Sequence, residues 1–178
     1  MKITKRKSLF KGKFLEVINK EILTDNGKKY FWECVKKTDV SFMFPLTKKK
    51  EVILEKIYKY PLESFIISMP AGMIDKKESF KTCAKRELFE ETGYKAKKMI
   101  PIFKFPINPG LSVQKGVLFF APDVRYVGGN ALEDLEIMEI LKIPLKKLPK
   151  LLFNPPKKVQ VDIKIFAALE ILKQKKLI

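Results

Sequence analysis

The chain has 178 residues, 46% of them hydrophobic, so it is long enough for one substantial core and too short for a second catalytic domain. Its 37 lysines and arginines against 20 aspartates and glutamates give a net charge of +17, which favours polyanionic partners such as nucleotides. Histidine is absent and the two cysteines are isolated, which excludes imidazole catalysis, a disulfide framework and a zinc site.

The sequence shows no membrane or targeting signal. No apolar run approaches the ~20 residues of a membrane span, and MKITKRKSLF lacks the apolar segment of a signal peptide. We therefore expect a cytoplasmic protein with no membrane partner. Lysine is spread along the whole chain, so we interpret most of the basic charge as a solvated coat, and nucleic acid is a less favoured partner.

The N-terminal part predicts a small sheet. Short apolar clusters between residues 8 and 44 are broken by polar residues, and Asp25-Asn26-Gly27 is typical of a hairpin turn. A sheet of this size is marginal alone, so it must pack on the main domain or on a second subunit. We expect a β subdomain over residues 1–44, used for dimerisation, and a main domain over residues 45–178.

Further strands are predicted at Phe42 to Pro45, Val52 to Tyr58 and Phe65 to Met69, and Ala71-Gly72 is predicted to be a tight turn. The aromatic and basic pair Tyr58-Lys59 suits stacking on a base and holding a phosphate. The alternative is a pair of ordinary edge-strand residues, with the lysine stem lying along the protein surface.

A helix is predicted over residues 80–92, with Gly93 as its C-terminal stop. At roughly 100° per residue, Glu87, Glu90 and Glu91 share one sector with the apolar Phe80, Cys83, Ala84 and Leu88, while Arg86 and Thr92 take the other side. Three carboxylates on the side that faces protein are costly without a cation. Oxygen ligands on a helix suit magnesium or manganese. The alternative is a solvated acidic helix end with an ion pair between Arg86 and Glu90.

After this helix the pattern predicts a strand, a Pro109-Gly110 turn and a strand from Gly116 to Ala121. A loop over residues 123–135 and a strand from Ile137 to Ile143 follow. Leu145 to Phe153 predicts a short helix, and about Val159 to Lys175 a final helix with apolar residues on two sides. The order of elements predicts an α/β fold, an α/β/α sandwich with a mixed sheet.

The segment GMIDKKESFKTCAKRELFEETGY, residues 72–94, resembles the Nudix box, a glycine, a glutamate after five residues, and R-E-(apolar)-x-E-E-x-G-(apolar) after seven more. The matching positions are Gly72, Glu78, Arg86, Glu87, Leu88, Glu90, Glu91 and Gly93. The whole chain is similar in layout to the ADP-ribose and nucleoside-diphosphate-sugar pyrophosphatase branch of that superfamily. The shared features are FKGKFLEV before a hairpin, Tyr58-Lys59, Pro70-Ala71-Gly72, and Pro109, 15 residues after Tyr94.

The resemblance implies roles for residues of the box and beyond. The Ala71 carbonyl, Glu87 and Glu91 would bind the divalent metal, with Glu90 completing the cluster. Arg86 would orient these carboxylates, Glu78 would tie the loop to the helix, and Gly72 and Gly93 would be structural. Tyr58, Lys59 and Gly110 would contact the substrate. Two positions depart from the branch: Lys59 replaces the usual arginine, and Ser68 stands where an acidic residue often precedes the Pro-Ala-Gly turn.

The resemblance also implies a homodimer that exchanges its N-terminal sheet, and a general base on a loop after the box. By position we favour Glu136, with Glu133 and Glu139 as alternatives; for each, a plain solvated carboxylate is the competing interpretation.

The implied activity is magnesium-dependent hydrolysis of the diphosphate of ADP-ribose or a nucleotide sugar to a nucleoside monophosphate and a sugar phosphate, with manganese as an alternative metal. A second hypothesis, motivated by the charge, is removal of pyrophosphate from an RNA 5′ end or a dinucleoside polyphosphate. A third is a nucleotide-sensing module without catalysis, which is disfavoured because the box is intact.

Overall fold

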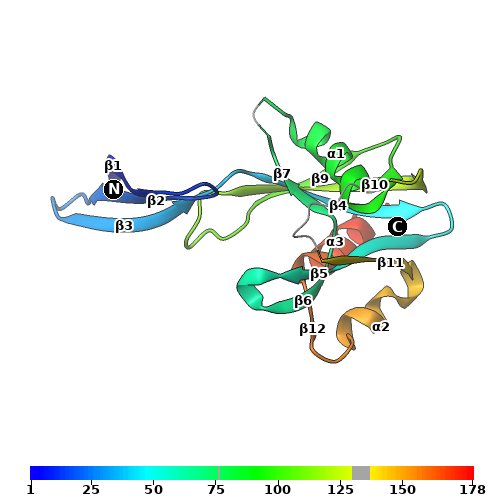
Figure 1. The fold of residues 1–178 in the computed structure, drawn as a ribbon. Coiled ribbons are helices and arrows are strands. Elements are labelled where there is room, and N and C mark those ends of the chain that lie inside the picture. The colour runs from blue at the N-terminus through cyan, green and yellow to red at the C-terminus, as the bar shows by residue number, and fades with distance from the viewer. Residues whose placement is uncertain (76, 130–136) are drawn as a thin grey trace.

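The computed structural model describes residues 1–75, 77–129 and 137–178 (Figure 1). The N-terminal residues form an antiparallel sheet of β1 (Lys2–Lys11), β2 (Glu16–Leu23) and β3 (Lys29–Lys36). Its β2–β3 hairpin turns at Gly27, whose φ of 77° is the left-handed conformation that glycine adopts readily. The predicted hairpin is therefore confirmed, and Figure 1 shows the sheet projecting from the body of the molecule as an arm.

The arm is joined to the body through Val35. The Val35 N–H donates to the Leu111 carbonyl at 2.8 Å, and the Val35 carbonyl accepts from the Val113 N–H at 3.1 Å. The two sheets part between Lys36, the last residue of β3, and Val40, the first residue of β4. The predicted division into residues 1–44 and 45–178 stays a prediction, and β4 already belongs to the main sheet.

The described residues of the body form a nine-stranded mixed sheet. Two pairs are parallel, β10 with β4 and β12 with β6, and the remaining pairs are antiparallel. The strands are β4 (Val40–Thr47), β5 (Glu51–Lys59), β6 (Ser64–Ser68), β7 (Ala71–Met73), β8 (Tyr94–Lys95), β9 (Ile100–Pro106), β10 (Lys115–Tyr126), β11 (Met138–Pro144) and β12 (Val159–Val161).

Helices cover both faces of this sheet. On one face, α1 (Phe80–Thr92) buries Ala84 and Leu88 against Met43 and Ile53 of the sheet. On the other, α2 (Leu148–Phe153) and α3 (Ile163–Gln174) pack against Phe44 and other apolar residues that point the opposite way. Short 3-10 turns lie at Tyr60–Leu62 and Leu145–Lys147. The predicted α/β/α sandwich with a mixed sheet is therefore confirmed.

Capping interactions at both ends of α1 explain why its bounds could be predicted from sequence. The Ser79 hydroxyl accepts a hydrogen bond from the Thr82 N–H at 3.1 Å, which caps the first turn. At the other end, Gly93 has a φ of 71° and its N–H donates to the Phe89 carbonyl. The predicted helix over residues 80–92 is confirmed at both ends.

Three expectations are corrected by pairing between distant segments. Ala71-Gly72 is not a tight turn but the start of β7, which pairs with β4. The last helix begins at Ile163, because residues 159–161 form β12 beside β6 and Asp162 caps the helix. Residues 123–126, expected in a loop, extend β10.

The two apolar sides of the final helix differ in burial. Its Ile165, Ala168, Leu169 and Leu172 are buried, whereas on the other apolar side Phe166 and Ile171 are partly buried against the core and Ile163 is 72% exposed. Within the described ranges, no helix combines the length and the apolar character needed to cross a bilayer.

We predict that Gly93→Ala lowers the free energy of unfolding by about 1–2 kcal/mol, because an L side chain is strained at this positive φ. A Cβ there would also lie 2.8 Å from Cε2 of Tyr126. Chemical denaturation measures the change. Gly110→Ala is the control: a Cβ at Gly110 meets nothing within 4 Å, so a change within about 0.5 kcal/mol is expected. Equal losses in the two variants would contradict the explanation.

Candidate active site

The site is built where α1 lies against β7. A Cβ placed on Gly72 would be 1.8 Å from Cδ of Glu87, so only glycine leaves room for this glutamate. The close approach holds the Glu87 carboxyl group against the backbone of β7, next to Ala71. Gly72 and Glu87 are 15 residues apart in the sequence, and their contact fixes how the helix sits on the strand.

Arg86 forms hydrogen bonds with three carboxylates, those of Glu78, Glu87 and Glu90, which we call the outer carboxylates. Its Nε and Nη2 donate to the two oxygens of Glu78 at 3.1 and 2.9 Å, a bidentate pair. Its Nη1 donates to Glu87 at 2.8 Å and to Glu90 at 2.9 Å, and Nη2 also donates to the Met73 carbonyl at 3.2 Å. The hydrogen bonds that Arg86 donates hold the pKa of Glu78 below its usual value, and donating to Glu78 and Glu90 raises the pKa of the guanidinium.

This network shows where the helical projection of the sequence was incomplete. Arg86 starts on the side opposite the glutamates, yet its long side chain reaches around the helix to Glu87 and Glu90. Thr92, projected to the outer side, is buried and donates its hydroxyl hydrogen to the Leu88 carbonyl. The projection placed the three glutamates on the protein-facing side, and they differ in depth: the Glu90 side chain is 38% exposed and that of Glu87 is 16% exposed.

Glu91 is the deepest of the three glutamates. It is 7% exposed, and one of its carboxyl oxygens accepts the Ala71 N–H at 2.9 Å. Burial, followed by the charges of Glu55 and Glu87 and a hydrogen bond to Glu55, raises the pKa of Glu91 well above its usual value. Among the ion pairs of the described residues, none involves Glu91. The metal-free protein therefore holds a proton on Glu91 far more readily than an exposed glutamate would.

Glu55 is the member of this cluster that sequence reasoning missed. It lies in the middle of β5 and is 2% exposed. A signal was present: β5 carries Ile53 and Ile57 at alternate positions, and a glutamate between them on the same face breaks the apolar pattern. A buried charge in such a strand is uncommon enough to mark a functional position.

Of the three candidate bases, Glu139 is the one that lies among the described residues. Glu136 and Glu133 fall outside the described residues. Glu139 is on β11 with its side chain 62% exposed, and it forms an ion pair with Lys56 at 3.3 Å. Their catalytic roles stay predictions.

The predicted substrate contacts are also spread out. Tyr58 packs edge-on against Tyr60 and Phe65, with ring centroids 5.4 Å apart in both pairs. Strand alternation places Lys59, which is exposed, on the same face of β5 as Glu55. Gly110 lies on the exposed loop that meets the arm. The substrate roles of these three residues stay predictions.

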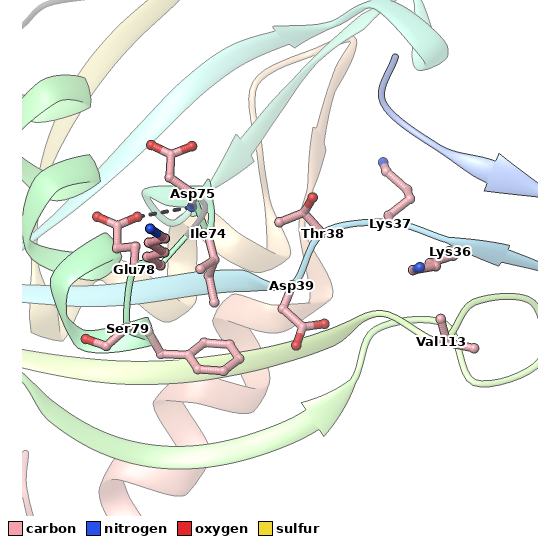
Figure 2. Close-up of a pocket in the computed structure, with 11 residues that line it drawn as sticks. Lys36, Lys37, Thr38, Asp39, Ile74, Asp75, Glu78, Ser79 and Val113 are labelled. Atoms are coloured by element: carbon pink, nitrogen blue, oxygen red, sulfur yellow. Dashed lines mark hydrogen bonds between the residues drawn. The ribbon is translucent and has the colours of Figure 1, made fainter. Parts of the chain in front are cut away.

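A hollow of about 730 Å³ borders the loop that leads into α1 (Figure 2). One wall is the linker after β3, and the other is the loop around Ile74 and Glu78. The Glu78 side chain accepts the Asp75 N–H at 3.2 Å, so the same residue shapes the wall and holds Arg86. Three lysines contribute to the lining: Lys36, Lys37 and Lys77.

The cluster fits a divalent metal by its chemistry. Among the described residues, no three acidic or cysteine side chains are arranged as a complete metal site in the structure as it stands. The acidic side chains gathered beside the backbone of β7, those of Glu87 and Glu91, nevertheless offer carboxylate oxygens only. Such oxygen ligands suit magnesium or manganese rather than zinc or copper.

Comparison with known proteins gives concordant matches. A family model described as NUDIX domain matches residues 36–169. The ADP-ribose pyrophosphatase of Bacillus subtilis (strain 168) is 31% identical over 147 residues, which cover 82% of this chain and 80% of that protein. The ADP-sugar pyrophosphatase of Mus musculus is 28% identical over 183 residues, 93% of this chain and 84% of that protein.

A solved structure of an ADP compounds hydrolase superposes with a TM-score of 0.82, covering 98% of this chain and 92% of that one. Its sequence identity is 22%, so this likeness shows a common fold.

Because Glu91 is buried, we predict that the free energy of unfolding of the metal-free protein depends on pH through this residue. Its pKa is raised in the folded state, so its contribution to stability is greatest below about pH 4.5 and is lost as the pH rises toward the folded pKa. In metal-free protein, Glu91→Gln should therefore raise the free energy of unfolding at pH 8 by an amount on the order of 1 kcal/mol or more, and by less at pH 5.

Denaturant unfolding in the presence of a chelator at both pH values tests this expectation. Glu170→Gln, on the exposed side of α3, is the control and should show no pH-dependent difference from the wild type. A Glu91→Gln variant that is less stable than wild type at pH 8 would contradict the assignment of a costly buried charge.

Proposed function

This chain belongs to the Nudix family, and we propose that it hydrolyses the diphosphate of ADP-ribose or a nucleotide sugar. The observation that carries the proposal is the arrangement of Glu87 and Glu91 against the Ala71-Gly72 backbone, with Arg86 holding the outer carboxylates. The names of the relatives support the substrate class, since they describe pyrophosphatases of ADP-ribose and ADP-sugars. The products are a nucleoside monophosphate and a sugar phosphate.

The metal would be held by the Ala71 carbonyl, Glu87 and Glu91, with Glu90 at the outer edge. Bound magnesium, or manganese in its place, supplies positive charge that offsets the negative charge developing on the diphosphate. Arg86 keeps the Glu87 and Glu90 carboxylates in place, and Glu78 keeps Arg86 in place through its bidentate pair. These hydrogen bonds preorganise the site before the substrate binds.

Water attacks one phosphorus in line with the bond that breaks, and its proton passes to a carboxylate. Glu136 is our candidate for this base, by its position after the box. Lys59 and Tyr58 on β5 and Gly110 on the loop beside the arm are our candidates for substrate contacts. A lysine at position 59 offers the diphosphate a point charge, where an arginine would offer a fork.

We also propose a homodimer built through the N-terminal arm. Exposed apolar side chains are concentrated there: Leu9, Phe10, Phe14, Tyr30, Phe31 and Trp32 are between 47% and 66% exposed. Phe31 and Trp32 are adjacent on β3, so they point to opposite faces, and both faces of the arm lack a core of their own. A second copy would cover this surface. A cytoplasmic location remains our expectation.

We predict that Glu87→Gln and Glu91→Gln each reduce turnover of ADP-ribose at least about a hundredfold with magnesium present. Each change removes one negative charge and leaves the side-chain volume unchanged, so far-UV circular dichroism should match the wild type. Product identification by mass spectrometry should show AMP and ribose 5-phosphate. Glu170→Gln is the control and should retain full activity, because Glu170 is exposed on α3 and its carboxylate is bonded to Gln174 of the same helix.

Two alternatives are separated by the same assay. The net charge of +17 favours a polyanion, so triphosphorylated RNA and dinucleoside polyphosphates belong in the substrate panel. Faster turnover of either than of every nucleotide sugar would replace the proposed substrate class. Tight nucleotide binding with no product from any compound would instead identify a sensing module.

The dimer has its own test. Light scattering should give the wild type twice the monomer mass of 20.7 kDa. The double variant Phe31→Asp, Trp32→Asp should give the monomer mass, because charge on both faces of β3 prevents apolar burial. Phe153→Asp places the same change at a side chain that is 73% exposed on α2 and should leave the dimer intact. A monomeric wild type would refute the dimer.

A further inference from the structure

Strand alternation places Glu55 on the face of the sheet that carries the site. Its neighbours Leu54 and Ile53 belong to different apolar cores: Leu54 packs with α3, and Ile53 packs with α1. Side chains two residues apart on a strand share a face, so Glu55 points to the α1 side with Ile53. At 2% exposure it lies within the protein and not at the rim of the site.

Glu55 meets the inner end of the carboxylate cluster. It is hydrogen-bonded to Glu91, the deepest of the glutamates that α1 contributes. A fold gains nothing in stability from two adjacent buried carboxyl groups, because an apolar residue would fill the space at lower cost. The structural alternative is that Glu55 only shares a proton with Glu91.

The register of the sheet adds a second, independent observation. Glu55 of β5 lies directly opposite Ser68 of β6, and Ser68 is also buried at 7% exposure. Residues directly opposite on antiparallel strands point to the same face, with Cβ atoms about 4.5–5.5 Å apart. Ser68 is the position where the sequence departs from an expected acidic residue. A carboxyl group is therefore present on the neighbouring strand, directly opposite Ser68 and on the same face of the sheet.

We propose that Glu55 is a further carboxylate ligand of the divalent metal site, supplied by β5 and acting beside Glu91 of α1. This inference rests on the proposed function and extends it to a residue outside the Nudix box. The site then draws its carboxylates from two sides, Glu87 and Glu91 from the helix and Glu55 from the sheet. The positive charge of the metal would offset the negative charge of these carboxylates where they meet between helix and sheet.

The first experiment measures Mn²⁺ affinity by titration calorimetry or electron paramagnetic resonance, with no substrate present. Glu55→Gln should weaken Mn²⁺ binding at least about tenfold. Metal-free Glu55→Gln should be at least as stable as the wild type, because the change removes a buried charge. Glu51→Gln is the matched control: it changes the other glutamate of β5, which is bonded to Thr47 at the far end of the strand, and should leave the affinity unchanged.

The second experiment moves the carboxylate across the strand pair. The double variant Glu55→Gln, Ser68→Glu should recover Mn²⁺ affinity to within a few-fold of the wild type, because the new carboxylate enters the same space. Unchanged affinity in Glu55→Gln would overturn the proposal. A loss that Ser68→Glu does not recover would overturn it as well, since the loss would then come from a disturbed pocket.

The experiments distinguish a wrong proposed function from a wrong role for Glu55. A wild type that neither binds Mn²⁺ nor hydrolyses any diphosphate compound would refute the hydrolase. A wild type that does both, with a Glu55→Gln variant of equal Mn²⁺ affinity, would refute only the role of Glu55.

Discussion

The burial of the Glu91 carboxyl group is the constraint on which the rest of the site depends. A single turn of helix carries Glu87 and Glu91 toward the sheet, where charge is costly. Close contact is possible because Gly72 has no side chain, and the Ala71 N–H supplies a hydrogen bond at the deepest point. The caps at Ser79 and Gly93 fix the length of the helix, so they also fix which of its residues reach this position.

The carboxylates are held in two different ways. Arg86 binds the outer group, Glu78, Glu87 and Glu90, through charged hydrogen bonds of 2.8–3.1 Å. Glu91 forms no ion pair with any described residue, and its partners are a backbone N–H and another acid. The protein thus neutralises the outer carboxylates with its own cation and leaves the inner pair to a proton or a metal. Arg86 therefore fixes the positions of the outer carboxylates, whereas no described cation binds Glu91.

Helix α1 and the β2–β3 hairpin could be predicted from sequence because the residues that determine them lie within each segment. Ser79, Gly93 and the apolar spacing determine α1 within its own segment, and Asn26-Gly27 determines its hairpin in the same way. The strands β7 and β12 could not be read, because three residues carry too little pattern and pairing with β4 and β6 decides their conformation. Glu55 was missed for a related reason. The contact between Glu55 and Glu91 exists only because α1 packs on this face of the sheet, which the sequence of β5 does not reveal.

The net charge of the protein and the local charge at the site have opposite signs. The chain as a whole carries +17, a field that attracts an anionic substrate over distances up to the Debye length of about 8–10 Å. Within a few ångströms of Ala71 the local charge is negative, which attracts a divalent cation and would repel a phosphate that arrived alone. Under the proposed function, a diphosphate would bind closely only together with the metal, so the carboxylates that are costly in the empty site would make substrate binding depend on the ion.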